Sequence, residues 1–226
     1  MLEQDKETED IVSRITLATN SQNPVDLKDL RANDAKQIGL SMSIEELGYV
    51  YRRKRAEITT KSTNITTGTA AMAVLSVWRQ EPHRAKFYGR EHFGRLYHQI
   101  FTDDLNGAQV IIAVLLYRFA ENRRRRPLPT DPTFAPYASC FLAMLMGKRL
   151  LKEMKLSRVD ELDHRNFAEA KFLLEKNENA FFDDAVANIE IALKNLYGDN
   201  WDTKISMQQL SATFRRGDLI ESLVNT

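Results

Sequence analysis

The hydrophobic positions along the chain recur with a helical period almost from end to end. In the first segment the spacing i, i+1, i+4, i+7 and i+8 places them on one helix face. These positions are Ile11, Val12, Ile15, Ala18 and Thr19. Pro24 disfavours helical backbone at Asn23 before it, so this helix is expected to end near Asn20. A short helix follows, with Asp26 as a plausible N-cap.

A third helix is predicted from about Asp34 to Leu47, and Gly48 suits the position after its end. Large β-forming residues come next, which predicts a short strand near Tyr49–Arg53. The stretch ITTKSTNITTGT, from Ile58 to Thr69, is rich in Thr and Ser and has no clear period. We expect a loop there that leads into a helix at about Thr67.

The remainder of the chain reads as helices with short connections. One helix ends before Pro82, and an amphipathic one follows over Gly89–Phe101. Asp103 or Asp104 is expected to cap a long helix that reaches about Arg124. The further helices are expected at Tyr137–Met154, His164–Lys176 and Ala180–Gly198, with a proline-rich loop before the first and a tail that breaks at Gly217. The apolar helices around Ile112 and Leu142 are predicted to be neighbours in the core.

These elements predict a mainly α fold, a bundle-like domain of several helices with at most a short strand near Tyr49–Arg53. Composition agrees with a soluble globular chain: 226 residues, 43% hydrophobic and 28% charged. The net charge of +1 gives no global attraction for nucleic acid, so any basic patch must be local. The longest apolar run, Val110–Tyr117, is far shorter than the about 20 residues of a membrane span, so no membrane contact is expected.

The single cysteine, Cys140, cannot form an internal disulfide, which favours a reducing compartment and a cytoplasmic location. It lies among apolar residues and is expected to be a buried, unreactive thiol. No pair among the four histidines has metal-binding spacing, and phosphate loops and serine nucleophile elbows are absent from the sequence. We therefore predict no catalytic residue, no metal and no cofactor, and no activity in this chain alone.

Two features are candidates for ligand contacts. The amides of Asn20, Gln22 and Asn23 crowd one loop, with Arg31 shortly after them. They can satisfy the backbone hydrogen bonds of that loop, or they can contact a polar ligand or a base edge.

The basic run Arg52, Arg53, Lys54 and Arg55 follows Tyr49 and Tyr51. It can be solvated or internally paired, for example with Glu57, or it can bind phosphate beside stacking aromatics. Residue types and spacing leave both alternatives open.

A second basic run, Arg123–Arg126, lies at the end of the predicted long helix. Cations at a helix C-terminus offset the macrodipole, and the prolines that follow are expected to keep this run in solvent. We interpret it as structural.

The stretch ITLATNSQNPVDLKDLRAND, from Ile15 to Asp34, resembles the signature of the AIPR family, the abortive infection phage resistance proteins. Its pattern is I-x-x-A-T-N-S-Q-x-x-V-x-x-x-D-L, followed by a tyrosine with a basic run, here YVYRRKRAE. A helix that ends in Glu81-Pro82 and a later Tyr97-x-x-Ile100-Phe101 also belong to the pattern. The similarity extends from about Ile11 to Phe101.

The resemblance implies a role in bacterial phage defence, and it implies two features that this chain lacks. Family members carry an N-terminal nuclease-like region and an Asn-Gly-x-Gln-Thr motif before the signature. NGAQV, Asn106–Val110, resembles that motif by letters, but it follows the signature and lies inside a predicted helix. The chain therefore resembles the C-terminal portion of such a protein. We expect a signature segment, residues 1–101, and a C-terminal helical segment, residues 102–226, within one continuous domain.

We accordingly predict a non-catalytic helical module of a phage-defence protein that contacts DNA or RNA. It would act with a nuclease-bearing partner chain or with the N-terminal half. The candidate contacts are Asn20, Gln22, Asn23, Arg31, Arg52, Arg53, Lys54 and Arg55. The alternative is a structural or regulatory domain that binds only protein. The sequence does not determine the oligomeric state.

Overall fold

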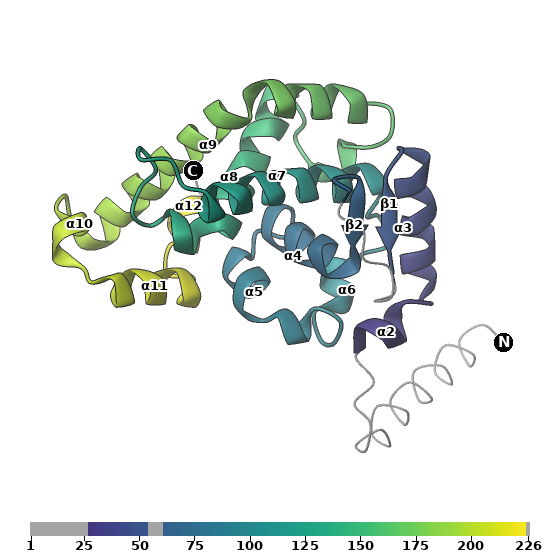
Figure 1. Ribbon diagram of the computed structural model, residues 1–226, viewed down its shortest axis with the longest axis horizontal. Coiled ribbons are helices and arrows are strands. Elements are labelled where there is room, and N and C mark those ends of the chain that lie inside the picture. The colour runs from purple at the N-terminus through teal and green to yellow at the C-terminus, as the bar shows by residue number, and fades with distance from the viewer. Residues whose placement is uncertain (1–26, 54–60, 225–226) are drawn as a thin grey trace, which may run out of the picture.

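The fold is mainly α, as predicted, in a computed structural model that describes residues 27–53 and 61–224. Figure 1 shows the helices wrapped around a central layer that contains α4, α7 and α8. The elements in chain order are α2 (Leu27–Arg31), α3 (Ala35–Glu46), β1 (Val50–Arg52), β2 (Asn64–Thr66), α4 (Thr67–Val77), α5 (Pro82–Phe87), η1 (Gly89–Glu91), α6 (Tyr97–Ile100), α7 (Gly107–Arg125), α8 (Ala135–Glu153), η2 (Val159–Glu161), α9 (Phe167–Tyr197), α10 (Trp201–Lys204), α11 (Met207–Arg216) and α12 (Ile220–Val224). The helix predicted over residues 11–20 lies outside the described residues.

The predicted boundaries of the third helix are confirmed as those of α3, whereas Asp26, the predicted N-cap of the short helix before it, lies outside the described residues. The side chain of Asp34 caps α3 by accepting a hydrogen bond of 2.9 Å from the backbone N–H of Lys36. Gly48 follows the end of α3 with a φ of 81°, a left-handed conformation that glycine adopts without strain. The chain then turns directly into β1, so the end of α3 fixes where this strand begins.

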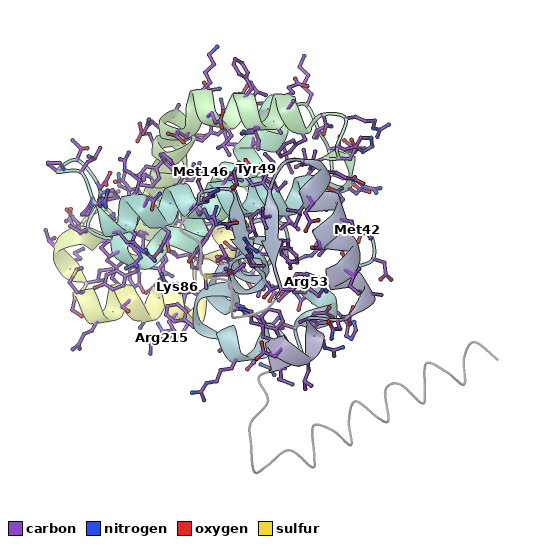
Figure 2. All side chains as sticks on the ribbon, turned by 45° about the vertical axis from the view of Figure 1, so that its right-hand side comes forward. Met42, Tyr49, Arg53, Lys86, Met146 and Arg215 are labelled. Atoms are coloured by element: carbon purple, nitrogen blue, oxygen red, sulfur yellow. The ribbon has the colours of Figure 1, made fainter. Side chains whose placement is uncertain are left out.

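The predicted short strand is confirmed as β1, but the loop predicted over residues 58–66 is wrong in its last three residues. These residues form β2, which pairs in parallel with β1 and sets Tyr51 opposite Ile65. A three-residue strand is too short to show a period, and its pairing with β1 is a non-local contact. Arg53, which directly follows β1, is labelled in Figure 2.

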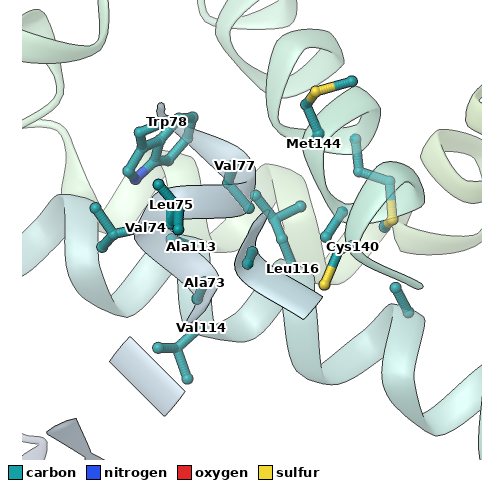
Figure 3. Close-up of a cluster of buried hydrophobic side chains, with 14 of the residues drawn as sticks. Ala73, Val74, Leu75, Val77, Trp78, Ala113, Val114, Leu116, Cys140 and Met144 are labelled. Carbon is teal, nitrogen blue, oxygen red and sulfur yellow. The ribbon is translucent and has the colours of Figure 1, made fainter. Parts of the chain in front are cut away.

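The core is built where α4 and α8 pack against α7. Figure 3 shows side chains of α4 such as Val74 and Val77 facing Val114 and Leu116 of α7, with Cys140 and Met144 of α8 beside them. Gly147 lets α8 approach α4, because a Cβ at this position would run into the Val77 side chain. The prediction that the two apolar helices are neighbours in the core is confirmed, because α7 packs against α8.

The single helix predicted over residues 89–101 is wrong. The segment forms the short η1, a series of turns and the one-turn helix α6. Its five large apolar side chains are nevertheless buried, as their spacing indicated: Phe93, Leu96, Tyr97, Ile100 and Phe101. The position of the core residues was therefore predicted correctly while the backbone that carries them was not.

Three further helix predictions need correction. The long helix α7 is capped by Asn106, whose side chain accepts from the N–H of Gln109 while the Gln109 side chain accepts from the N–H of Asn106. This reciprocal capping box replaces the predicted cap at Asp103 or Asp104.

The helices predicted at His164–Lys176 and Ala180–Gly198 are one continuous helix, α9. The Glu81-Pro82 pair does not end a helix, because α4 ends at Val77 and Pro82 begins α5.

The described residues include no helix with the length and apolarity that crossing a bilayer requires. The division of the chain near residue 101 remains a prediction.

Candidate nucleic-acid interface

The structure brings the described part of the predicted site together at one place, which we call the α2–β1 corner. It consists of Arg31–Asp34 at the end of α2 and Arg52–Arg53 at the end of β1. The Nη1 of Arg53 donates a hydrogen bond of 2.6 Å to the backbone carbonyl of Ala32, across 21 positions of sequence. Ala32 is only 2% exposed, so this contact joins the end of the strand to the end of the helix in a fixed geometry. Two segments that the sequence offered as separate candidates thus form one surface.

Arg31 is held at the corner by a ring and by a carboxylate. Its guanidinium carbon lies 4.4 Å from the centroid of the Tyr97 ring, and its Nη1 lies 3.5 Å from the Asp34 carboxylate. The ring attracts the cation through its π face and accepts no classical hydrogen bond from it. The 3.5 Å ion pair is long, and the Arg31 side chain keeps 30% of its surface exposed. Arg31 is therefore positioned but still open to solvent.

A buried polar network lies beneath these arginines. The Tyr51 hydroxyl donates to Oε1 of Gln37 at 2.7 Å, and Nε2 of Gln37 donates to the Tyr97 hydroxyl at 3.3 Å. Gln37 has no exposed surface, so both ends of its amide need these partners. The network connects α3, β1 and α6, and it sets the positions of the strand that carries Arg53 and of the ring that carries Arg31.

Burial raises the pKa of Tyr51 well above that of an ordinary tyrosine, and a nearby Tyr97 raises it further. Burial likewise raises the pKa of Tyr97 far above its usual range, although the hydrogen bond from Gln37 lowers it in part. Both hydroxyls therefore stay protonated at physiological pH. They serve as hydrogen-bonding anchors, and neither is poised to act as a base.

Sequence reasoning missed Gln37 and Lys36. Gln37 stands one and two turns before Ser41 and Ile44, on the buried face of α3, and this spacing could have marked it as an interior residue. The ammonium of Lys36 lies 2.8 Å from Asp103 and donates to the carbonyl of Phe101 at 3.1 Å. It ties α3 to the loop before α7 and adds a further cation beside the corner.

Asn20, Gln22, Asn23, Lys54 and Arg55 lie outside the described residues. Among the described residues, no group of three or more His, Cys, Asp and Glu side chains could hold a metal ion.

The second basic run, Arg123–Arg126, is largely paired within the protein. Arg123 contacts Asp131 at 2.5 Å and lies 4.5 Å from the centroid of the Phe182 ring, while Arg124 and Arg125 both contact Glu121. The interpretation of this run as structural is therefore supported. Internal ion pairs hold most of its side chains, whereas the sequence predicted that the run would be solvated. Arg126 is exposed.

NGAQV also has a structural role. Gly107–Val110 lie in the first turn of α7, as predicted, and Asn106 is the N-cap that forms the capping box with Gln109. The same side chains donate to the carbonyls of Leu162 and Val159 at 2.9 and 3.0 Å. Gly107 is required there, since a Cβ would lie 2.6 Å from the backbone of Ser43 on α3.

The described residues define a helical protein with a cationic corner that is anchored on a buried polar network. A family model described as AIPR protein matches residues 2–188, and the chain belongs to this family. Membership supports a role in abortive infection, a form of defence against phage. No curated protein and no solved structure matches the chain.

Proposed function

We propose that this chain is the non-catalytic, nucleic-acid-contacting module of an abortive-infection protein, and that the α2–β1 corner is its contact surface. The observation that carries the proposal is the hydrogen bond from Arg53 to Ala32, which gathers the arginines of two sequence segments at one place. Guanidinium groups bind phosphate oxygens well, because their N–H donors match the geometry of the anion. In a protein of net charge +1, such a local cluster is the kind of surface on which phosphate contacts are expected.

Arg31 and Arg53 keep much of their charge available at the corner. Arg53 donates to a carbonyl, which is a neutral acceptor, and Arg31 shares one long ion pair with Asp34. The amide-rich stretch of the signature ends at Asp34, within this corner. We propose that Asn20, Gln22, Asn23, Lys54 and Arg55 extend the contact surface. The cutting of nucleic acid would be supplied by a nuclease-bearing partner chain or by a nuclease-like N-terminal region.

The proposal is tested by the binding of fluorescein-labelled single- and double-stranded DNA and RNA 20-mers, followed by anisotropy between 50 and 200 mM salt. Each phosphate contact contributes about −0.7 to −0.9 to the slope of log affinity against log salt. We expect Arg31→Gln/Arg53→Gln to weaken binding and to reduce this slope by about one to two. Arg149→Gln is the matched control, because Arg149 is a partly exposed, ion-paired arginine on α8 that does not contribute to the corner.

No binding at 50 mM salt would overturn the nucleic-acid function. Unchanged binding by the double variant would overturn the assignment of the corner, provided that its circular dichroism and thermal unfolding match those of the wild type.

The alternative function, a domain that binds only protein, is favoured by one observation beside the corner. Ile38 and Met42 stand one turn apart on the outer face of α3 and are 38% and 63% exposed. If the chain bound no nucleic acid at low salt, binding to protein alone would be the better-supported function.

A further inference from the structure

A second surface lies at the far end of the molecule, between the start of α8 and the outer face of α11. It is a groove of about 570 Å³, which we call the α8–α11 groove. Its lining is Tyr137 from α8 with Met207, Gln208, Ser211, Ala212, Arg215 and Arg216 from α11. Figure 2 labels Arg215 on α11 and, well apart from it, Arg53 of the α2–β1 corner. The two surfaces are therefore separate.

The groove is preformed, because α11 is fixed from its inner side. Leu210 and Phe214 of α11 are buried, and the Phe214 ring packs edge-on against Phe141 of α8 with centroids 5.1 Å apart. A capping box between Ser206 and Gln209 defines the start of the helix. The outward residues of α11 recur every three to four positions, so they form a continuous stripe on a rigid support.

The charge of the lining has one sign. Arg215 and Arg216 contribute cations, and no aspartate or glutamate is among the lining residues. Arg216 is paired with Asp218 at 2.8 Å, just outside the lining. The guanidinium of Arg215 lies 5.2 Å from the centroid of the Phe87 ring, a contact that uses none of its N–H donors. Arg215 is thus oriented by an aromatic ring, and its N–H groups can still donate hydrogen bonds to a carboxylate.

The remainder of the lining favours apolar contacts. Met207 is 49% exposed, and Ala212 and Tyr137 are partly exposed beside it. Methionine is flexible and polarizable, which suits surfaces that accept an apolar side chain from a partner. An apolar floor with an arginine rim matches a peptide helix that carries leucine-like residues on one face and carboxylates beside them.

Single-stranded nucleic acid fits the groove less well. Nucleic-acid grooves provide several aromatic platforms for successive bases, whereas this lining offers the single ring of Tyr137. We propose that the α8–α11 groove binds an acidic, amphipathic peptide segment of a partner protein. This binding is independent of the nucleic-acid contact proposed for the corner. Six of the seven lining residues belong to α11, beyond residue 188, where the family match ends.

The test is a selection of random 16-residue peptides, displayed on yeast, for binding to the intact chain. We expect the selected peptides to combine Asp or Glu with Leu, Ile or Phe at helical spacing. Synthetic, fluorescein-labelled copies should bind the wild type and Arg149→Glu equally, because Arg149 is remote from the groove. They should lose at least about tenfold in affinity with Arg215→Glu, which reverses a rim charge.

Met207→Glu provides a second variant that spares the fold, since half of this side chain is exposed, and it should weaken peptide binding as well. Selected peptides without acidic residues, no selected peptides, or peptides that bind both variants like the wild type would overturn the proposal. The proposal would also be overturned, in favour of nucleic acid, if a labelled 16-mer of deoxythymidine bound the wild type but not Arg215→Glu while peptide binding was the same for both.

Discussion

Glu121, near the end of α7, is the carboxylate that pairs with two arginines of the second basic run, Arg124 and Arg125. Its side chain is only 10% exposed and accepts hydrogen bonds of 2.9 and 2.5 Å from Arg124 and of 3.2 Å from Arg125. Burial alone would raise the pKa of this carboxyl. The hydrogen bonds from Arg124, together with the nearby charge of Lys86, outweigh burial and lower the pKa to about 2. Glu121→Gln removes the charge and keeps the shape.

The magnitude follows from that pKa. A decrease from the ordinary 4.5 to about 2 corresponds, at about 1.4 kcal/mol per pKa unit, to about 3 kcal/mol of folding free energy. The side chains of Arg124 and Arg125 are 32% and 68% exposed, so water screens part of the attraction. We therefore expect about 1–2 kcal/mol. Because folding lowers the pKa, this stabilisation is complete above about pH 5 and is lost as the pH falls towards 2.

The assay is urea unfolding of the wild type and Glu121→Gln at pH 7 and pH 3. At pH 7 the variant should be less stable by about 1–2 kcal/mol, and at pH 3 by less than half of that. Glu175→Gln serves as the control, because Glu175 is 62% exposed in its pair with Lys171 and should change stability by less than about 0.5 kcal/mol. An equal deficit of Glu121→Gln at both pH values, or none at pH 7, would refute the reasoning.

Two further predictions concern packing and the thiol. Gly107→Ala should destabilise the fold by more than about 2 kcal/mol, because its Cβ would lie 2.6 Å from the backbone of α3. Gly39→Ala, in an open position within α3, should be neutral or stabilise by about 0.5–1 kcal/mol, and urea unfolding that ranks the two variants alike would contradict the close approach. Cys140 is 1% exposed, and burial raises the pKa of its thiol to about 12, so a disulfide reagent at about pH 8 should label it only when urea unfolds the chain.

The sequence predicted the elements whose information is local. α7 and α8 carry long apolar patterns, and their existence and their contact follow from those patterns. β2 could not be predicted, because a three-residue strand exists only through pairing with β1. The segment of residues 89–101 shows a different limit. Its apolar spacing correctly marked the buried side chains, but short turns can bury the same set of positions as a helix.

The candidate site was predictable residue by residue but not as a surface. Arg31 and Arg53 were marked by their neighbours in sequence, whereas their convergence depends on contacts between distant segments. The amide of Gln37 joins Tyr51 to Tyr97 across 14 and 60 positions. Such a network becomes visible only when the strand, α3 and α6 are placed together. The spacing of α3 could have placed Gln37 in the interior, but it could not have named the partners.

The two arginine runs show what separates a structural run from a candidate binding run. Arg124 and Arg125 follow Glu121 by three and four positions on a helix, which is the spacing that brings opposite charges together. The single carboxylate of Glu121 therefore offsets part of their charge inside the protein. Arg53 follows a strand, where residues three and four positions apart are separated by about 10–13 Å along the chain and do not pair. Its acceptor is the carbonyl of Ala32. A carbonyl orients a guanidinium and leaves its positive charge intact. A phosphate is attracted by charge that the fold has not neutralised. The run that contains Arg53 is therefore the better candidate for phosphate binding, although the two runs are almost identical in composition.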